Sequence, residues 1–228
     1  MTPTELFADL REVARETLER GGAPASHDFS HVLRVVANAE RIAEAEHGNI
    51  AICRMAALLH ELVNLPKNHP ESHRSGDLCA IEVERVLDAR GVERGFVEAV
   101  AACVRDHAFS KGVSPASLEA RILQDADRLD AIGAIGVARC MATAAEMKSR
   151  FYSPDDPLAT KRPLDDRAFA LDHFAKKLFR IPERLHTPTA RAIAAERVAF
   201  MHTFVDALAR ECAFESTEQV ESRQRSRG

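Results

Sequence analysis

The sequence predicts an all-α protein, an orthogonally packed helical bundle, from three observations. Apolar residues recur three and four positions apart along most of the chain, which is the spacing of one helix face. Alternating β-branched runs, which are typical of strands, are missing. No period of roughly 20 to 50 residues repeats itself, so a solenoid is disfavoured.

The first expected helix is Pro3–Arg20. Thr2 caps its beginning, proline suits the first turn, and the glycine pair at 21–22 ends it. A second helix is expected to begin near His27 and to end before Gly48. Its predicted buried face comprises Val32, Val35, Val36, Ala39, Ile42 and Ala43.

The third helix, at about 51–63, is so apolar that we expect it at the centre of the fold. A loop follows at 64–70, because two prolines there prevent a continuous helix. The most irregular stretch is 153–163, with three prolines and several charges. The remaining helices are expected at about 71–89, 93–107, 115–129, 131–151, 165–179 and 188–213.

The length of 228 residues is compatible with one domain. We expect residues 1–213 to form a single helical domain that the C-terminal helices complete. Residues 214–228 are polar and are expected to be a disordered tail. The sequence leaves the oligomeric state open, a homodimer included.

Composition argues against several classes of partner. The 31 basic and 35 acidic side chains leave a net charge of −4, and with no Trp and one Tyr a nucleic-acid polymer is not an expected partner. No long apolar run indicates a signal peptide or a membrane span. The five cysteines are dispersed without a C-x-x-C pair, which favours the reducing cytoplasm.

Four short stretches could carry chemistry: 27–31, the pair His60-Glu61, 67–70 and 124–130. A glutamate beside a histidine at the end of an apolar helix is unusual, because burying an unpaired carboxylate is costly. A bound cation would remove that cost. Mixed imidazole and carboxylate donors suit a divalent ion such as Mn, Mg, Co, Ni or Fe, with positions left for water.

The order His31, His60-Glu61, Asp127 resembles the H…HD…D signature of the HD superfamily. A narrower likeness, to bacterial HD-domain phosphohydrolases, rests on HDFSHVLRV at 27–35, LLHE at 58–61, PKNHP at 66–70, HAFS at 107–110 and QDADRLDAIGAIGVAR at 124–139. The likeness covers about residues 5–212. It implies an HD-type helical bundle that hydrolyses a small phosphorylated substrate, with (d)NTP pyrophosphohydrolase and nucleotidase as the favoured activities.

The resemblance also implies ligands for the metal, at His31, His60, Glu61 and Asp127. Cationic and donor side chains near a metal-bound phosphate can offset its charge. The expected substrate contacts are His27, Lys67, His107 and Lys177, and the expected catalytic residues are Glu61, Asp130 and Lys67.

Two positions depart from the family pattern. Glu61 stands where the superfamily has aspartate, which moves the carboxylate one methylene farther out. Asn64 stands where several HD nucleotidases have an acid that assists proton transfer, and an amide cannot be a general acid or base. Glu71, Asp77 and Asp130 are alternatives for that role, and we assign it to Asp130.

Three other functions stay open on the sequence alone. With Glu61 and Asn64 at these positions, the chain could bind metal and nucleotide without turnover. An HD-type diiron oxygenase would use further histidines, for which His69, His73 and His107 are available. A structural helical adapter would leave the coincidence of the ligand positions unexplained.

Overall fold

The computed structural model describes residues 2–21, 28–65, 69–107 and 115–212. These residues form helices without a strand, and the only β pairing among them is an isolated bridge between Arg150 and Phe169. The all-α prediction is therefore confirmed. The elements are α1 (Pro3–Arg20), α2 (Phe29–Ala45), α3 (Ile50–Leu59), η2 (Ser72–Arg74), α4 (Ser75–Asp88), α5 (Arg94–His107), α6 (Leu118–Leu129), α7 (Gly133–Glu146), α8 (Ala170–Lys176), η4 (Leu178–Arg184) and α9 (Pro188–Cys212).

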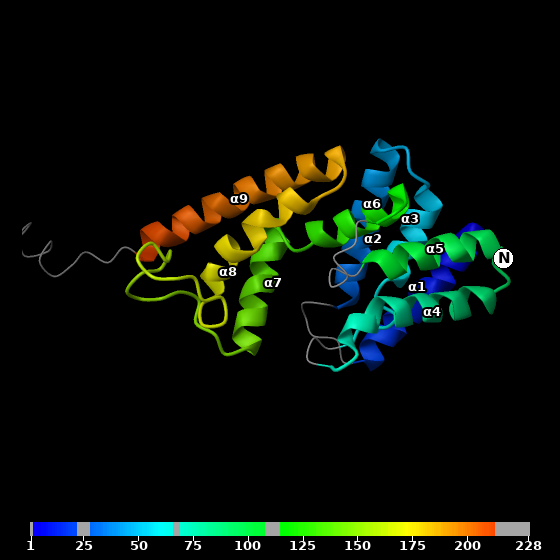
Figure 1. Ribbon diagram of the computed structural model, residues 1–228, viewed down its shortest axis with the longest axis horizontal. Helices are drawn as coiled ribbons and strands as arrows, with labels where there is room; N and C mark the ends of the chain where they lie inside the picture. The colour runs from blue at the N-terminus through cyan, green and yellow to red at the C-terminus, as the bar shows by residue number, and fades with distance from the viewer. Residues whose placement is uncertain (1, 22–27, 66–68, 108–114, 213–228) are drawn as a thin grey trace, which may run out of the picture.

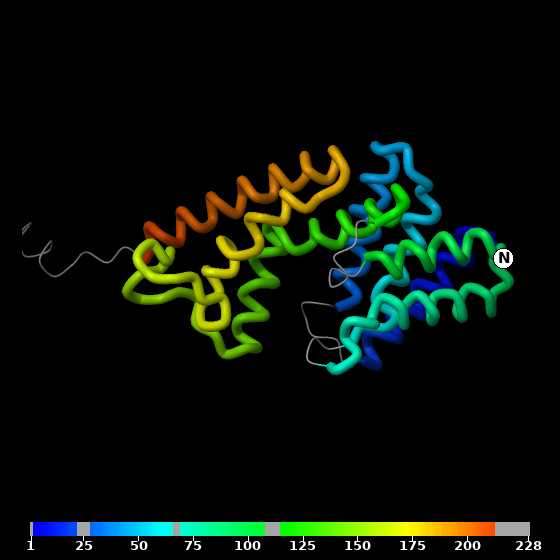
Figure 2. The backbone as a smooth tube through the Cα atoms, in the orientation of Figure 1, coloured from blue at the N-terminus to red at the C-terminus, as the bar shows by residue number. Residues whose placement is uncertain are grey.

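The helices α1 to α6 gather at one end of an elongated molecule, and α7, α8 and α9 lie at the other (Figure 1). Helix α2 packs against α3 and α6, and α4 packs along α5. A short turn joins α6 to α7, which runs at a steep angle to it (Figure 2). Steep crossings of this kind make the fold an orthogonally packed bundle.

Helix α2 follows the expected pattern. Asp28 caps it, because its carboxylate accepts a hydrogen bond from the backbone N–H of His31 at 3.1 Å. All six residues of the predicted apolar face are buried. The first turn of α2 therefore presents His31 toward the centre of the bundle.

Helix α3 ends at Leu59, four residues earlier than expected. The Sγ atom of Cys79 in α4 donates to the carbonyl oxygens of Leu59 and His60, at 3.4 and 3.2 Å. The carbonyl oxygen of Leu59 also accepts the backbone N–H of Leu62 at 3.2 Å, so both carbonyls are satisfied without further α3 turns. His60 consequently lies at the C-terminal end of α3, and Glu61 lies in the turn beyond it.

The later helices are also shorter than expected. Helix α7 begins at Gly133, whose φ of +80° disfavours any residue with a side chain, and Arg197 packs against the space that a Cβ would fill. It ends before Lys148, which has a φ of 56°. The helix expected at 165–179 begins only at Ala170, after the Arg150–Phe169 bridge, and the non-helical backbone of Lys177, with a φ of −135°, divides it into α8 and η4.

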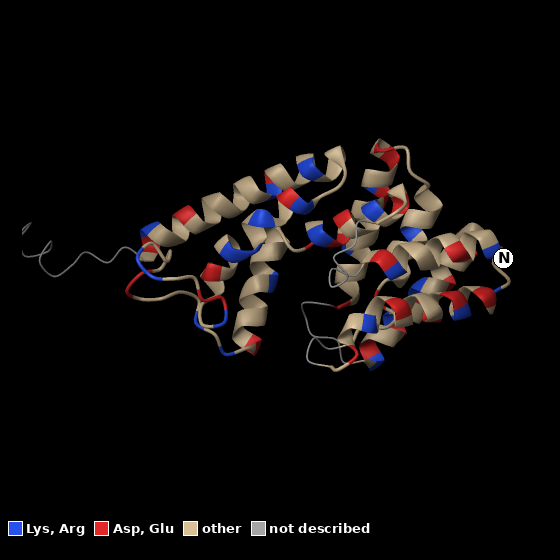
Figure 3. Cartoon of the chain, in the orientation of Figure 1, with Lys and Arg blue, Asp and Glu red and all other residues tan. Residues whose placement is uncertain are grey.

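Acidic and basic side chains are interspersed along the described helices (Figure 3). No helix among the described residues is both long enough and apolar enough to cross a membrane. The expected tail at 214–228 lies outside the described residues, and the expectation of a single domain over 1–213 stays a prediction.

Candidate metal centre

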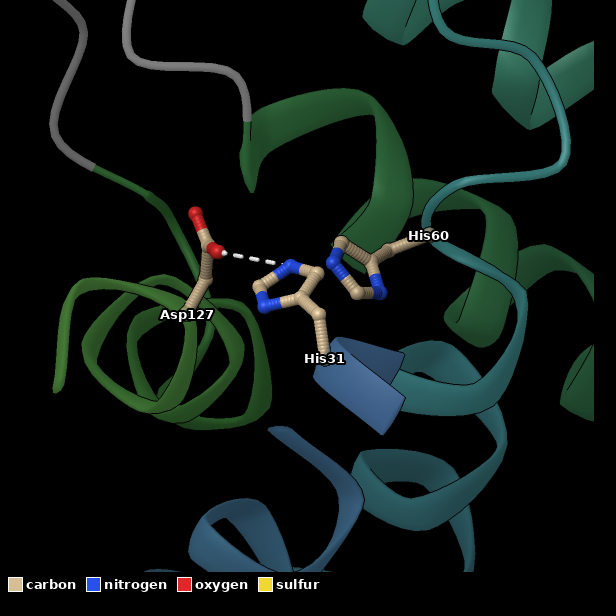
Figure 4. Close-up of side chains that lie close together, drawn as sticks. All are labelled: His31, His60 and Asp127. Atoms are coloured by element: carbon tan, nitrogen blue, oxygen red, sulfur yellow. Dashed lines mark ion pairs between the residues drawn. The ribbon is translucent and has the colours of Figure 1, made fainter. Parts of the chain in front are cut away.

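His31, His60 and Asp127 converge although they come from three different helices. His31 belongs to the first turn of α2, His60 follows α3, and Asp127 lies in the last turn of α6. One possible ligand atom from each lies within 4.8 Å of the other two. The three side chains point toward one another in Figure 4. Ligand bonds of about 2 Å place two ligands of one ion about 4 Å apart or less, so small shifts would complete the site.

The ring of His31 is oriented by a carboxylate on its far side. Nδ1 lies 2.7 Å from Oδ2 of Asp130, and Nε2 lies 3.5 Å from Oδ1 of Asp127. Because an ionised carboxylate can only accept, Nδ1 carries the hydrogen and donates it to Asp130. The lone pair of the imidazole then lies on Nε2, facing Asp127.

Asp130 is almost completely buried and is bound by two arginines. Arg34 donates from Nε at 2.6 Å and from Nη2 at 3.0 Å, and Arg139 donates from Nη1 at 2.7 Å. Burial would raise the pKa of Asp130, but hydrogen bonds from His31 and Arg34 outweigh it and lower the pKa to about 2. The group is therefore a stable anion, which suits a partner for His31 better than it suits a proton donor.

The ring of His60 is oriented in the same way as that of His31, but its Nδ1 partner is a backbone carbonyl. Nδ1 lies 2.7 Å from the carbonyl oxygen of Ala57, to which it donates. Nε2 is buried and has no hydrogen-bond partner within the described part of the chain. Burial, together with the nearby His107 and His31, lowers the pKa of His60 to about 3, so the ring is neutral near pH 7.

These donors fit a divalent cation. A buried ring nitrogen without a hydrogen bond costs about 1–3 kcal/mol, which a metal bond would remove. Both imidazoles hold their hydrogen on Nδ1 and present Nε2, and carbonyl or carboxylate partners of this kind are usual for metal-bound histidines. Asp127 supplies the negative charge that a hard or borderline cation prefers.

Glu61 lies beside this cluster. Its Oε1 is 3.8 Å from Nε2 of His60, and its side chain is 11% exposed. Burial, and then the charge of Asp127, raise the pKa of Glu61, which is the expected effect of two close carboxylates in the absence of a cation. Nδ2 of Asn64 donates to Oε2 of Glu61. The two departures from the family pattern are therefore in direct contact.

Of the further histidines considered, His107 alone is close. Its ring is perpendicular to that of His60, with centroids 5.3 Å apart, and its Nδ1 donates to the carbonyl oxygen of Val104. His69 and His73 are exposed, and Nδ1 of His69 accepts the backbone N–H of Glu71. The structure thus brings only one of the three to the cluster.

The remaining expected site residues divide into two groups. His27 and Lys67 lie outside the described residues. Lys177 lines a cavity of about 640 Å³ between α7 and α8, together with Lys176, His173 and Arg139. The lining does not include His31, His60 or Asp127, so the cavity lies beside the metal cluster and not over it.

The sequence analysis missed two functional candidates, Arg34 and Arg139. Both are part of the motifs that carry the family resemblance, but only the structure shows that both bind Asp130. A signal was available in the sequence: a buried acid among histidine ligands needs cationic partners, and arginine is the usual one.

Comparisons with known proteins identify the family of this chain. Residues 28–132 match the family model for the HD domain. The YpgQ protein of Bacillus subtilis strain 168 is 34% identical over 185 residues, which is 79% of this chain and 82% of that protein.

Solved structures are similar over nearly the whole chain. The crystal structure of B. subtilis YpgQ in complex with ADP has a TM-score of 0.72 and 31% identity, and the match covers 92% of this chain and 97% of that one. An HD-superfamily hydrolase from Bacillus thuringiensis has a TM-score of 0.73 and 28% identity, covering 94% and 100%. From the match to the HD-domain model and the likeness to YpgQ, we conclude that the chain belongs to the HD superfamily.

Proposed function

We propose that this protein is a divalent-metal-dependent phosphohydrolase that acts on a small phosphorylated substrate, a nucleotide. The observation that carries the proposal is the convergence of His31, His60 and Asp127, in which the buried Nε2 of His60 has no hydrogen-bond partner among the described residues. HD domains bind divalent metals, and this donor set suits that role.

His31, His60 and Asp127 would hold the ion, and Glu61 would join them directly or through one water. The bound ion would supply Lewis acidity toward a phosphoryl oxygen and lower the pKa of a water molecule. The ion can be Mn, Mg, Co, Ni or Fe, since the donor set does not distinguish them.

The protein's own residues then have separate tasks. Asp130 acts as a positioning residue: it holds His31 in the tautomer that presents Nε2, in place of the proton-transfer role expected from the sequence. His107, whose ring lies perpendicular to that of His60, is a further side chain beside the cluster that could contact a phosphate oxygen. Lys177, in the cavity between α7 and α8, offers a cation for a phosphate farther from the metal.

Two observations support a nucleotide as the substrate. YpgQ, which is 31% identical over nearly the whole chain, was solved in complex with ADP. The cavity beside the cluster has a volume of about 640 Å³, which lies in the range of small-molecule sites, roughly 300–1,000 Å³. The two activities to be separated are pyrophosphate release from (d)NTPs and phosphate release by a nucleotidase.

The test is hydrolysis of nucleoside mono-, di- and triphosphates by purified protein after chelation and reconstitution with each candidate metal. Product chromatography would show pyrophosphate or phosphate, and His60→Gln should lose both turnover and metal retention. Asp125→Asn is the matched control, because Asp125 is buried but binds His186 and Thr187 and not the cluster. Metal and nucleotide binding without turnover of any nucleotide would contradict the proposal and favour a binding module.

A further inference from the structure

Arg139 both lines the cavity and contacts Asp130. It lies on α7 and lines the cavity between α7 and α8, while its guanidinium reaches back to the turn that joins α6 and α7. There its Nη1 donates to Oδ2 of Asp130 at 2.7 Å and to the carbonyl oxygen of Asp130 at 3.2 Å. The same Nη1 lies 3.5 Å from Nδ1 of His31.

The contacts of Arg139 with described residues all use this one nitrogen. Its Nε and Nη2 donate to no acceptor within the described part of the chain, and its side chain is 17% exposed. An arginine fork with unused donors at a cavity wall is suited to bidentate binding of a phosphate.

Two other basic side chains of the cavity lining contact Asp166. Lys176 donates to Asp166 at 2.6 Å, and Nδ1 of His173 lies 3.1 Å from the same carboxylate. The charge of Lys176 is therefore offset by Asp166. The single carboxylate of Asp130 accepts hydrogen bonds from Arg34 and His31 as well as from Arg139. It therefore neutralises the charge of Arg139 only in part, and Arg139 can attract a second anion.

We propose that Arg139 is a phosphate-binding residue: its Nε and Nη2 bind a phosphate group of the ligand in the cavity between α7 and α8, while Nη1 stays on Asp130. One side chain then joins the anion in the cavity to the carboxylate that orients His31. The inference rests on the proposed function in taking a phosphate as the ligand. Lysine could not replace Arg139, because a single ammonium cannot present a planar fork to one anion and a third donor to another.

Arg34 provides a matched control. Both arginines bind the carboxylate of Asp130, but Arg34 is not part of the cavity lining. A loss that arises only from weakened support of Asp130 should therefore appear in both variants. A loss that arises from direct contact with the anion should appear in Arg139 variants alone.

The experiment is calorimetric titration of the full-length protein with ADP and, separately, with inorganic pyrophosphate, both in EDTA so that no metal contributes. Arg139→Gln should weaken both ligands about 10-fold or more, as expected for a lost charge-assisted pair. Arg139→Lys should lose several-fold, and Arg34→Gln should stay within about 2-fold of wild type. Circular dichroism establishes that each variant is folded, and Arg139→Lys, which keeps the charge, serves if Arg139→Gln does not fold.

Three results would overturn the inference: wild-type affinity in both Arg139 variants, equal losses in Arg139→Gln and Arg34→Gln, or no binding of either ligand to the wild-type protein. These failures can be told apart from failure of the proposed function. The proposed function fails if no nucleotide is hydrolysed with any metal, whereas the titration is made without metal and without turnover.

Discussion

Replacing Asp130 by asparagine tests whether the metal centre depends on a carboxylate that is not itself a ligand. The Asp130 carboxylate accepts four hydrogen bonds, at 2.6, 2.7, 2.7 and 3.0 Å, from Arg34, His31 and Arg139. Asparagine keeps the shape, but it turns an NH2 group toward these donors and leaves two guanidinium groups without an anion. Breaking a buried ion pair from one side costs about 3–5 kcal/mol, so we expect a loss of that order in the free energy of unfolding.

The same change should reach the metal through His31. Without an anionic acceptor on Nδ1, the ring loses both its preferred tautomer and its orientation. Loss of such a partner weakens metal binding about 10- to 100-fold. Asp130→Asn should therefore show this loss in a competition titration against a metal-binding dye, at a temperature where the variant is folded.

Asp125→Asn is the control for the Asp130 prediction. Asp125 is completely buried and accepts hydrogen bonds from the backbone of His186 and from Thr187. Its replacement should lower stability while metal affinity stays near that of wild type. A folded Asp130→Asn protein that binds metal as tightly as wild type would refute the argument that His31 needs this carboxylate.

Three further changes test other contacts. Glu61→Gln should weaken metal binding and turnover together, and unchanged values would mean that Glu61 is not a metal ligand. Glu61→Asp, measured with and without Asn64→Ala, shows whether the longer side chain depends on the Asn64 contact. In metal-free protein, the His60 pKa is about 3 when folded against 6.5 for an ordinary histidine, so between these pH values the unfolded chain binds the extra proton. Stability should then fall as pH drops from 6.5 toward 3, by up to about 1.4 kcal/mol per pH unit, and His60→Gln in urea titrations should remove that part of the slope. Cys79→Ala should cost about 1–2 kcal/mol and weaken metal binding, because the carbonyl of His60 loses its donor and that of Leu59 keeps only the backbone N–H of Leu62. A Cys79→Ala protein with wild-type metal affinity would mean that this contact does not position His60.

The sequence predicted a helix end correctly where adjacent residues determine it. Thr2 and Gly21 bound the first helix as expected, because capping is a property of adjacent residues. The third helix was predicted too long, since Cys79, which donates to the carbonyl oxygen of His60 at the end of that helix, comes from another helix. Contacts between distant segments leave no trace in periodicity.

The candidate site shows the same limit. The convergence of His31, His60 and Asp127 could be predicted only through the family resemblance, because each is unremarkable in its own helix. The contact between His31 and Asp130 spans 99 positions, and the position of Arg139 depends on how α7 leaves the turn after α6. Residue types indicated which side chains could bind a metal or a phosphate, but the hydrogen-bond partners of these side chains are set by how the helices pack.

The two arginines on Asp130 differ in when they become available during synthesis. His31, Arg34 and Asp130 all belong to α2 and the end of α6, whereas Arg139 and the walls of the cavity are translated later. Folding during synthesis begins with the N-terminal segments that have already left the ribosome. Arg34 is therefore already translated when Asp130 appears, whereas Arg139 follows with the residues that line the cavity, which extend to Leu178. All three residues of the His31, His60 and Asp127 cluster are thus translated before any residue that lines the cavity.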